Sequence, residues 1–229
     1  VISLAIASLH FLGRKNYFRF VAAAGRKATM GEVKKLAAPG LSACINEMSS
    51  CVVLVIFNLL ILRAAGNTGV AAYGIVANLA LVELAVFTGV AQGLQPLLSR
   101  AYGRGDLQEV EALFRRGRHL AFLAGSIVLG AAVLFSHDLV VLFNSEHDAQ
   151  LQTLAEEGMR LYFIGFLAVG YNYLSAAVFS VAERSGAAFG LSFFRGCIGI
   201  AAAACLFSSL WGMVGIWLTF PAVEGVTAL

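Results

Sequence analysis

Long runs of apolar residues dominate this 229-residue sequence and leave it few ways to fold. Only 13% of the residues are charged, against about 25% in an ordinary soluble domain. None of the runs alternates with the period of two that a barrel strand requires. Such runs predict membrane-spanning helices. The core of a bilayer holds no water to bond the backbone, and a helix satisfies its own backbone N–H and C=O groups. We therefore expect an all-α integral membrane protein. The runs cover residues 1–12, 36–62, 70–98, 120–143, 158–181, 187–207 and 214–229.

Lys and Arg gather in every second connection between these runs. Segment 13–35 carries seven basic residues against Glu32, and segment 99–119 carries five arginines. The positive-inside rule places these connections in the cytoplasm, so the 36–62 helix runs outward and the next one returns. Within 106–119 we expect a short amphipathic helix at the cytoplasmic surface. Asp106 is its expected N-cap, because Glu109 follows three residues later as in a capping box.

Acidic side chains inside the spans are the first candidates for function, because a charge at membrane depth is costly. Glu47 has Asn46 beside it and follows Pro39 by eight residues. It faces either a cavity, where it binds a proton, a cation or a cationic solute, or another helix to which it hydrogen-bonds. Glu83 either lines the same cavity or is protonated and hydrogen-bonded. Glu224 ranks below these two, since the chain stops before a spanning helix around it is complete.

A polar cluster in the 158–181 span reads Tyr171–Asn172–Tyr173 and lies at mid-membrane. Asn172 is expected to hydrogen-bond across helices. The two tyrosines either present their rings to an organic cation or pack against neighbouring helices, and the sequence leaves both open.

The inner end of the 70–98 span holds Gln92, Gln95 and Pro96. Proline lacks the N–H that would bond the carbonyl of Gln92, and free carbonyls at membrane depth are tolerated where they line a wet cavity. This pattern suits a helix end that borders a vestibule open to the cytoplasm.

An enzyme is not expected. The histidines lie near helix ends and do not converge with the acidic residues, and the cysteines lie in apolar runs without CxxC spacing. We therefore predict no metal site, no redox pair, no cofactor beyond a coupling ion, and no nucleic-acid partner. These residues are His10, His119, His137 and His147, and Cys44, Cys51, Cys197 and Cys205.

Four stretches resemble the multidrug and toxic compound extrusion (MATE) family of transporters. "AAYGIVANLALVELAVFTGVAQGLQPLLSRAYGRGD" (71–106) is similar to the family's eighth helix and the loop after it. "LAAPGLSACINE" (36–47) resembles the start of the seventh helix. "FLAVGYNYLSAAVFSVAERS" (166–185) resembles the tenth helix of the bacterial branch typified by MepA and DinF. "GMVGIWLTFPAVEG" (212–225) looks like the start of the twelfth.

The resemblance implies a six-helix C-terminal bundle of a twelve-helix, two-lobe transporter. Residues 1–12 would be the tail of helix six and residues 13–35 a basic cytoplasmic loop between the lobes. Residues 36–229 would form the C-terminal lobe, helices seven to twelve, with the last complete or cut short. The implied partners are the lipid bilayer and the missing N-terminal lobe, in a bacterial cytoplasmic membrane.

The family further implies export of small organic, often cationic, compounds by alternating access, driven by inward H⁺ or Na⁺. By resemblance Glu47 takes the place of a seventh-helix carboxylate implicated in coupling and substrate binding. The polar residues inside the spans add Asn46, Glu83, Tyr171 and Asn172 as further candidates. Relatives of the NorM type carry an aspartate in the tenth helix where this chain has Asn172, so the coupling ion stays open. The alternative is a lipid-linked saccharide flippase of the same superfamily, which would need a basic cavity, although the spans hold only Arg195.

Overall fold

The computed structural model of the chain describes residues 30–182 and 185–229, and it describes side chains at Met48 and from Cys51 onward, except at 183–185. Residues 1–12, the expected tail of helix six, lie outside the described residues, as does most of the basic segment 13–35. The chain divides into two compact units, Val1–Ala38 and Pro39–Leu229. Every described side chain belongs to the second unit.

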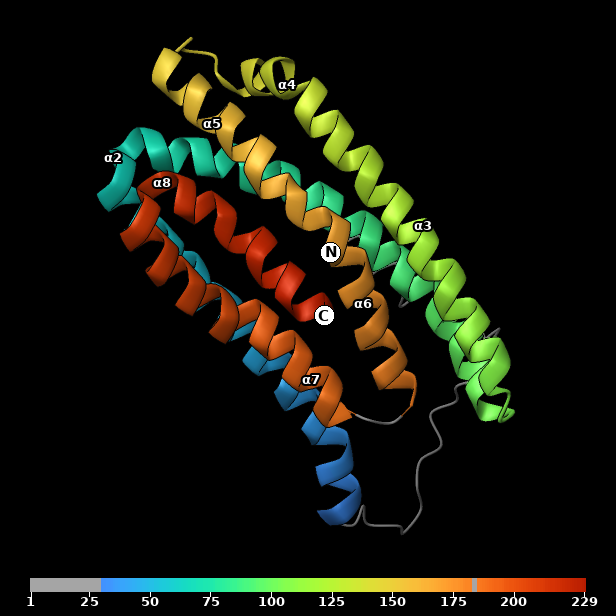
Figure 1. Ribbon diagram of the computed structural model, residues 1–229. Helices are drawn as coiled ribbons and strands as arrows, with labels where there is room; N and C mark the ends of the chain where they lie inside the picture. Colours follow the sequence, from blue (N-terminus) through green and yellow to red (C-terminus); the bar gives the residue numbers. More distant parts are fainter. Residues whose placement is uncertain (1–29, 183–184) are drawn as a thin grey trace, which may run out of the picture. The chain divides into compact units, whose positions relative to one another are not determined.

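The described residues form helices and no strands, which confirms the predicted all-α fold (Figure 1). A short 3₁₀ turn, η1, joins α5 to α6, and a π-helical segment, η2, joins α7 to α8. The elements are α2 (Met30–Gly103), α3 (Leu107–Leu134), α4 (Ser136–Phe143), α5 (Ala149–Tyr162), η1 (Phe163–Gly165), α6 (Phe166–Val181), α7 (Ser185–Phe193), η2 (Phe194–Ile198) and α8 (Gly199–Ala228).

Two of the helices turn back on themselves at a glycine. Gly66 in α2 has φ 65° and ψ −159°, and Gly212 in α8 has φ 57° and ψ −129°. Residues with a Cβ rarely adopt such angles, so glycine is the residue suited to these reversals. Figure 1 shows α2 and α8 each running to one end of the bundle and returning. Four helical stretches of the described chain are long and apolar enough to cross a membrane. Two of these stretches, in α2 and α8, contain a reversal at a glycine.

Helix α3 differs from the prediction at both ends. The expected span 120–143 breaks at Phe135, where α3 ends and the separate helix α4 begins. The expected surface helix 106–119 is not separate either, because α3 runs unbroken from Leu107 to Leu134. Asp106 is the N-cap as predicted, and its side chain accepts a hydrogen bond from the Glu109 N–H at 2.9 Å. The return half of the capping box is absent, since the Glu109 carboxylate pairs with Arg104 instead.

Small residues bring α3 and α6 into close contact. Gly117, Ala121 and Gly125 are spaced four apart on α3 and are buried. A Cβ added at Gly125 would lie 2.5 Å from the main-chain oxygen of Phe166, and one added at Gly170 of α6 would lie 2.5 Å from the Cβ of Ala121. This spacing of small residues is how membrane helices approach closely.

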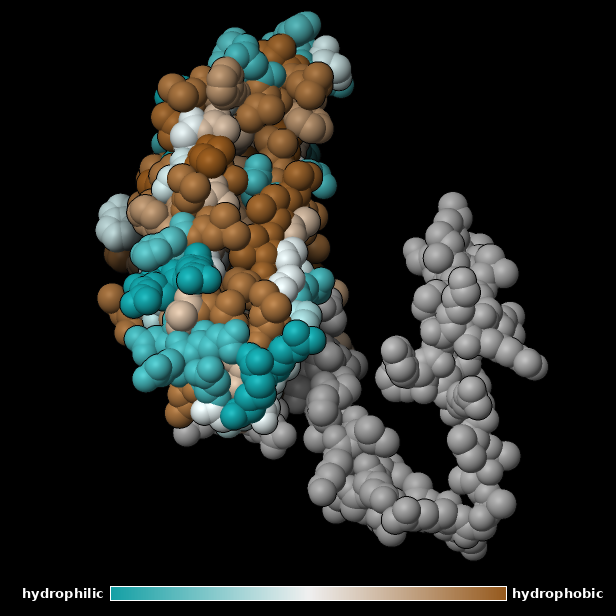
Figure 2. Space-filling model, turned by 90° about the vertical axis from the view of Figure 1, so that its right-hand side faces the viewer, coloured by the Kyte–Doolittle hydropathy of each residue, from teal (hydrophilic) through white to brown (hydrophobic). Residues whose placement is uncertain are grey.

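Large aromatic side chains fill the inside of the bundle, while apolar side chains also cover much of its outside. Trp217, Phe166 and Phe87 are almost fully buried in the main core cluster. Leu81 and Ile127 are more than 60% exposed. In Figure 2 apolar residues cover the middle of the face shown, and hydrophilic residues gather at its ends. Such an exposed apolar band suits contact with lipid chains.

Candidate functional site

Three polar side chains from different helices meet inside the bundle. The Asn172 amide of α6 donates to the main-chain oxygen of Glu224 in α8 at 2.9 Å and to its carboxylate Oε2 at 2.8 Å. The Arg195 guanidinium of η2 donates to the same Oε2 at 3.3 Å. Asn172 is 1% exposed and Glu224 4%. Glu224 is therefore buried, whereas its partner Arg195 is part-buried, with 17% of its side chain exposed.

Local departures from regular helix geometry place these groups. Arg195 lies in the π-helical segment η2, and π-helical turns are rare and frequently mark functional sites. Pro221 stands inside α8, almost one turn before Glu224, where it removes a backbone donor. A Cβ added at Gly165 would lie 3.1 Å from the Cα of Pro221, so the glycine lets η1 approach α8 at this point. The irregular backbone thus lies around the buried charges.

A cavity of about 270 Å³ opens beside the ion pair and is lined by both of its members. Tyr162 and Phe220 stack in its wall with ring centroids 4.3 Å apart and planes 6° from parallel. The guanidinium carbon of Arg195 lies 4.4 Å from the ring centroid of Tyr173, a cation–π contact. The wall of the cavity therefore combines aromatic and aliphatic side chains with one charge pair. Further lining residues are Val53, Leu54, Phe57, Tyr73, Leu84, Gly196 and Ile200.

The cluster has spare hydrogen-bond acceptors. Both side-chain hydrogen bonds to the Glu224 carboxylate reach Oε2, and no described residue donates to Oε1. The Asn172 Oδ1 atom is buried and has no hydrogen-bond donor among the described residues. Buried polar atoms are usually satisfied, so an acceptor left free beside a carboxylate suits a proton donor or a cation. The chemistry of the cluster favours holding one positive charge next to Glu224.

The residues predicted for the site divide between this cluster and other places. Asn172 makes the expected hydrogen bond across helices. Tyr171 lies outside the cavity and packs edge-on against Phe114 at 5.8 Å, whereas Tyr173 lines the cavity. Glu83 is half-buried, forms no hydrogen bond or ion pair with a described residue, and is not part of the cavity wall.

The predicted residues at the start of α2 cannot be compared with the cluster. Pro39, Asn46 and Glu47 lie on α2, but their side chains are outside the described residues. The coupling role expected of Glu47 stays a prediction.

The predicted residues at the inner end of α2 are exposed and lie outside the cavity. Gln92, Gln95 and Pro96 line no part of its wall. Helix α2 continues through Pro96 to Gly103, so this proline does not end the helix. Their place at a cytoplasmic vestibule stays a prediction.

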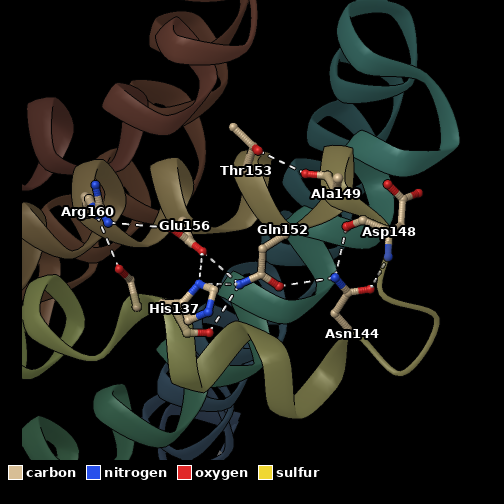
Figure 3. A network of polar contacts seen from close by, with 9 residues as sticks. His137, Asn144, Asp148, Ala149, Gln152, Thr153, Glu156 and Arg160 are labelled. Carbon is tan, nitrogen blue, oxygen red and sulfur yellow. Dashed lines mark hydrogen bonds and ion pairs between the residues drawn. The ribbon is translucent and has the colours of Figure 1, made fainter.

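A second polar cluster ties α4 to α5, as Figure 3 shows. His137 Nδ1 and the Gln152 amide both contact Glu156 Oε1 at 2.8 Å, and Arg160 lies 3.5 Å from the other carboxylate oxygen. The Asn144 amide bonds the main chain of Asp148 at the start of α5. These contacts hold the connection between two helices, and none of their residues lines the cavity beside Glu224.

The pairing of Arg195 with Glu224 was missed by the sequence reasoning, which ranked Glu224 low and treated Arg195 alone. One signal was available. Asn172 lies nine residues before the end of α6 at Val181, and Arg195 lies ten residues after the start of α7 at Ser185, so the two stand at similar depth. The contact of both with Glu224, 52 residues from Asn172, depends on how α8 folds back.

The fold and this buried charge cluster together define a multi-pass helical membrane protein with an internal aromatic cavity. Comparison with known families gives the class a name: the profile of the MatE family matches residues 43–205. The chain belongs to the MatE family, whose members are membrane transporters and not enzymes.

Solved structures with the same fold agree with this assignment. A multidrug resistance MATE family transporter of the MOP superfamily, in an outward-facing conformation, aligns with a TM-score of 0.86 at 19% identity, covering 99% of this chain and 50% of that one. MATE in complex with MaL6 aligns with a TM-score of 0.85 at 19% identity over 99% and 51% of the two chains. A MOP superfamily transporter from Pyrococcus furiosus aligns with a TM-score of 0.85 at 19% identity, covering 99% of this chain and 50% of that one.

At this level of identity the likeness concerns the fold alone. The chain spans about half the length of these solved transporters. No curated protein sequence matches it.

Proposed function

We propose that this chain is the C-terminal lobe of a transporter that exports organic cations in exchange for inward H⁺ or Na⁺. The sequence motifs support the lobe assignment, a bacterial cytoplasmic membrane, and the MepA- and DinF-like branch. One solved transporter of the same fold is a multidrug resistance protein, which supports the substrate class. Two-repeat transporters bind substrate near the interface between repeats, so the missing lobe would complete the site.

The ion pair between part-buried Arg195 and buried Glu224 carries this proposal. Glu224 holds one positive charge, the guanidinium, beside a cavity lined by aromatic rings. A proton, Na⁺ or an organic cation would take the same place once Arg195 moves aside. Because one carboxylate holds one of these charges at a time, binding of the coupling ion and of the substrate becomes mutually exclusive. Mutually exclusive binding at one site is what exchange requires.

The cost of an unpaired charge explains why Arg195 would hold Glu224 while no proton, ion or substrate is bound. Removing one member of a buried ion pair costs about 3–5 kcal/mol. Glu224 without proton, ion or substrate is therefore held by Arg195, its tethered cation, and the bare carboxylate is rarely populated. The aromatic wall adds attraction for organic cations through its ring faces.

A flippase for lipid-linked saccharides is the second candidate, and Arg195 is the observation that favours it. The Pyrococcus furiosus relative is described as having a binding pocket of reverse polarity that suggests a different function. A basic pocket would suit the phosphates of such a lipid. In this chain Glu224 neutralises Arg195, the one arginine among the described residues that line the cavity, so we rank the flippase second.

The test uses vesicles that contain the full-length parent protein and ethidium, with Na⁺ and pH gradients imposed separately. We expect efflux to follow one of the two gradients and to fall at least about tenfold in Glu224→Gln and in Glu47→Gln, as for loss of about 1.4 kcal/mol or more of binding. Glu146→Gln is the matched control, because Glu146 is exposed in the turn between α4 and α5.

Two results would count against the proposal. Normal efflux in Glu224→Gln would show that this carboxylate does not bind the exchanged cations. No efflux under either gradient in a well-expressed protein, together with phosphate-dependent binding of an isoprenoid-linked sugar, would favour the flippase.

A further inference from the structure

We propose that Gly199 is a positioning residue, because it allows the π-helical turn η2 that holds Arg195 on Glu224. Conversion of this turn to α-helical geometry would release Arg195 from the carboxylate. The role of Gly199 follows from the geometry of η2 and α8 alone. Its consequence for transport rests on the function proposed above.

Gly199 closes the π-helical turn. Its backbone N–H donates to the main-chain oxygen of Phe194, five residues earlier, whereas an α-helix uses the oxygen four residues earlier. A Cβ added at Gly199 would lie 2.9 Å from that oxygen and 3.1 Å from the Phe194 ring. Because the oxygen belongs to the backbone, no side-chain rotation relieves the first contact. A side chain at position 199 would therefore push the two ends of the turn apart.

The turn sets the direction of the Arg195 side chain. Arg195 is the second residue of η2, and its guanidinium donates to Glu224 Oε2 at 3.3 Å. The same guanidinium lies 4.4 Å from the ring centroid of Tyr173 on α6. Both contacts reach across to other helices, so they depend on the angle at which Arg195 leaves its own helix.

An α-helical turn in place of η2 would point Arg195 elsewhere. A single π-helical turn takes up one more residue than the α-helix around it. Without it, the chain before Gly199 would turn by up to about 100° and shift by about 1.5 Å, the rotation and rise of one residue. The half of α8 after the turn is anchored, because Ala204 is buried in one cluster with Phe57 and Ile61 of α2. The change therefore moves Arg195 relative to Glu224.

This movement is the one that exchange at Glu224 requires. The proposed function needs Arg195 to leave the carboxylate whenever a proton, Na⁺ or an organic cation takes its place. Arg195 on Glu224 favours the π-helical turn, and a cation on Glu224 favours the α-helical one. The two forms of η2 thus give the exchange two states whose populations a bound cation shifts.

The experiment measures how fast dicyclohexylcarbodiimide modifies Glu224 in the full-length protein in detergent, resolved by peptide mass spectrometry. The reagent couples to a protonated carboxyl group, and a carboxylate paired with a guanidinium is ionised. We expect slow modification in the wild type and fast modification in Arg195→Met. Gly199→Ala should speed it about fivefold or more, the change in population that corresponds to the smallest usual cost of overpacking.

Two control variants separate positioning from general loosening of the bundle. No described atom lies within 4 Å of a Cβ added at Gly190 of α7, so Gly190→Ala should react like the wild type. Gly125→Ala crowds α3 against α6 away from the turn, and it should also leave the rate at Glu224 unchanged. Glu83, which forms no ion pair with a described residue, is the internal reference for access of the reagent.

A second measurement keeps Gly199 in place. Arg195→Met removes the contact that holds the turn, so amide hydrogen exchange in residues 194–199 should become faster, while exchange in α3 should not change. The hydrogen bonds of the turn break whenever its geometry changes, which is the reason for the faster exchange.

Three results would overturn the proposal. The first is modification of Glu224 in Gly199→Ala at the rate of the wild type. The second is an equal acceleration in Gly125→Ala, which would mean general loosening. The third is unchanged exchange of residues 194–199 in Arg195→Met. None of these readouts involves transport, so normal efflux in Glu224→Gln would refute the proposed function and leave the role of Gly199 standing.

Discussion

Replacing Gly125 by alanine tests the packing on which the bundle depends. The added Cβ would lie 2.5 Å from the main-chain oxygen of Phe166 and 3.1 Å from its carbonyl carbon. Because the obstacle is backbone, no side-chain rotation relieves it, and α3 must move away from α6. Overpacking of this kind costs about 1–3 kcal/mol, while alanine regains up to about 1 kcal/mol of helix propensity relative to glycine. The net expectation is a loss of about 0.5–2 kcal/mol.

Gly130→Ala in the same helix is the matched control. No described atom lies within 4 Å of a Cβ at Gly130, so this change should stabilise α3 by up to about 1 kcal/mol through propensity alone. The assay is reversible denaturant unfolding of the full-length protein in detergent micelles. If Gly125→Ala proves as stable as Gly130→Ala, then α3 and α6 are not in backbone contact at Phe166.

Three further changes test single features of the bundle. Gly66→Ala should lower the free energy of unfolding by about 1–3 kcal/mol, because the residue has φ 65° and ψ −159°. Gly74→Ala, where no described atom lies within 4 Å of an added Cβ, should be neutral or stabilising. The unfolding midpoints of the two variants would be compared. Arg195→Met should lower stability by about 3–5 kcal/mol by leaving Glu224 unpaired, and adding Glu224→Gln should restore most of it; a double variant as unstable as the single one would contradict the ion pair. Asp106→Ala should lower the free energy of unfolding by about 0.5–2 kcal/mol and speed amide hydrogen exchange in the first turn of α3, because the Asp106 side chain caps that turn. Unchanged exchange would show that the cap contributes nothing.

Much of the fold could be predicted from hydropathy, because each pass through the bilayer needs its own apolar run. The run 70–98 falls within α2, and the run 158–181 falls within the continuous helical stretch Ala149–Val181 formed by α5, η1 and α6. The break at Phe135 was missed because apolar residues continue on both sides of it. The contact that holds α4 in place, His137 with Glu156, joins residues 19 apart and leaves no pattern in hydropathy.

The candidate site was predicted less well, since its residues meet only through the reversals of the chain. Asn172 could be singled out as a polar residue inside a span, and its bond to another helix is confirmed. Which helix supplies the partner depends on the turn at Gly212 and on the π-helical segment around Arg195. The turn at Gly212 falls in the predicted break between the runs 187–207 and 214–229, but the π-helical segment has no sequence signal of its own, so Glu224 was undervalued.

The central claim is that one carboxylate, Glu224, binds either the coupling ion or the exported cation. The most direct measurement is equilibrium binding of ethidium to the purified full-length protein over a range of pH and Na⁺ concentration. The account predicts that the apparent dissociation constant of ethidium rises with the concentration of one of the two ions. Glu224→Gln should abolish this dependence, while Glu146→Gln should preserve it. Ethidium binding that ignores both ions, or competition that survives in Glu224→Gln, would contradict the account.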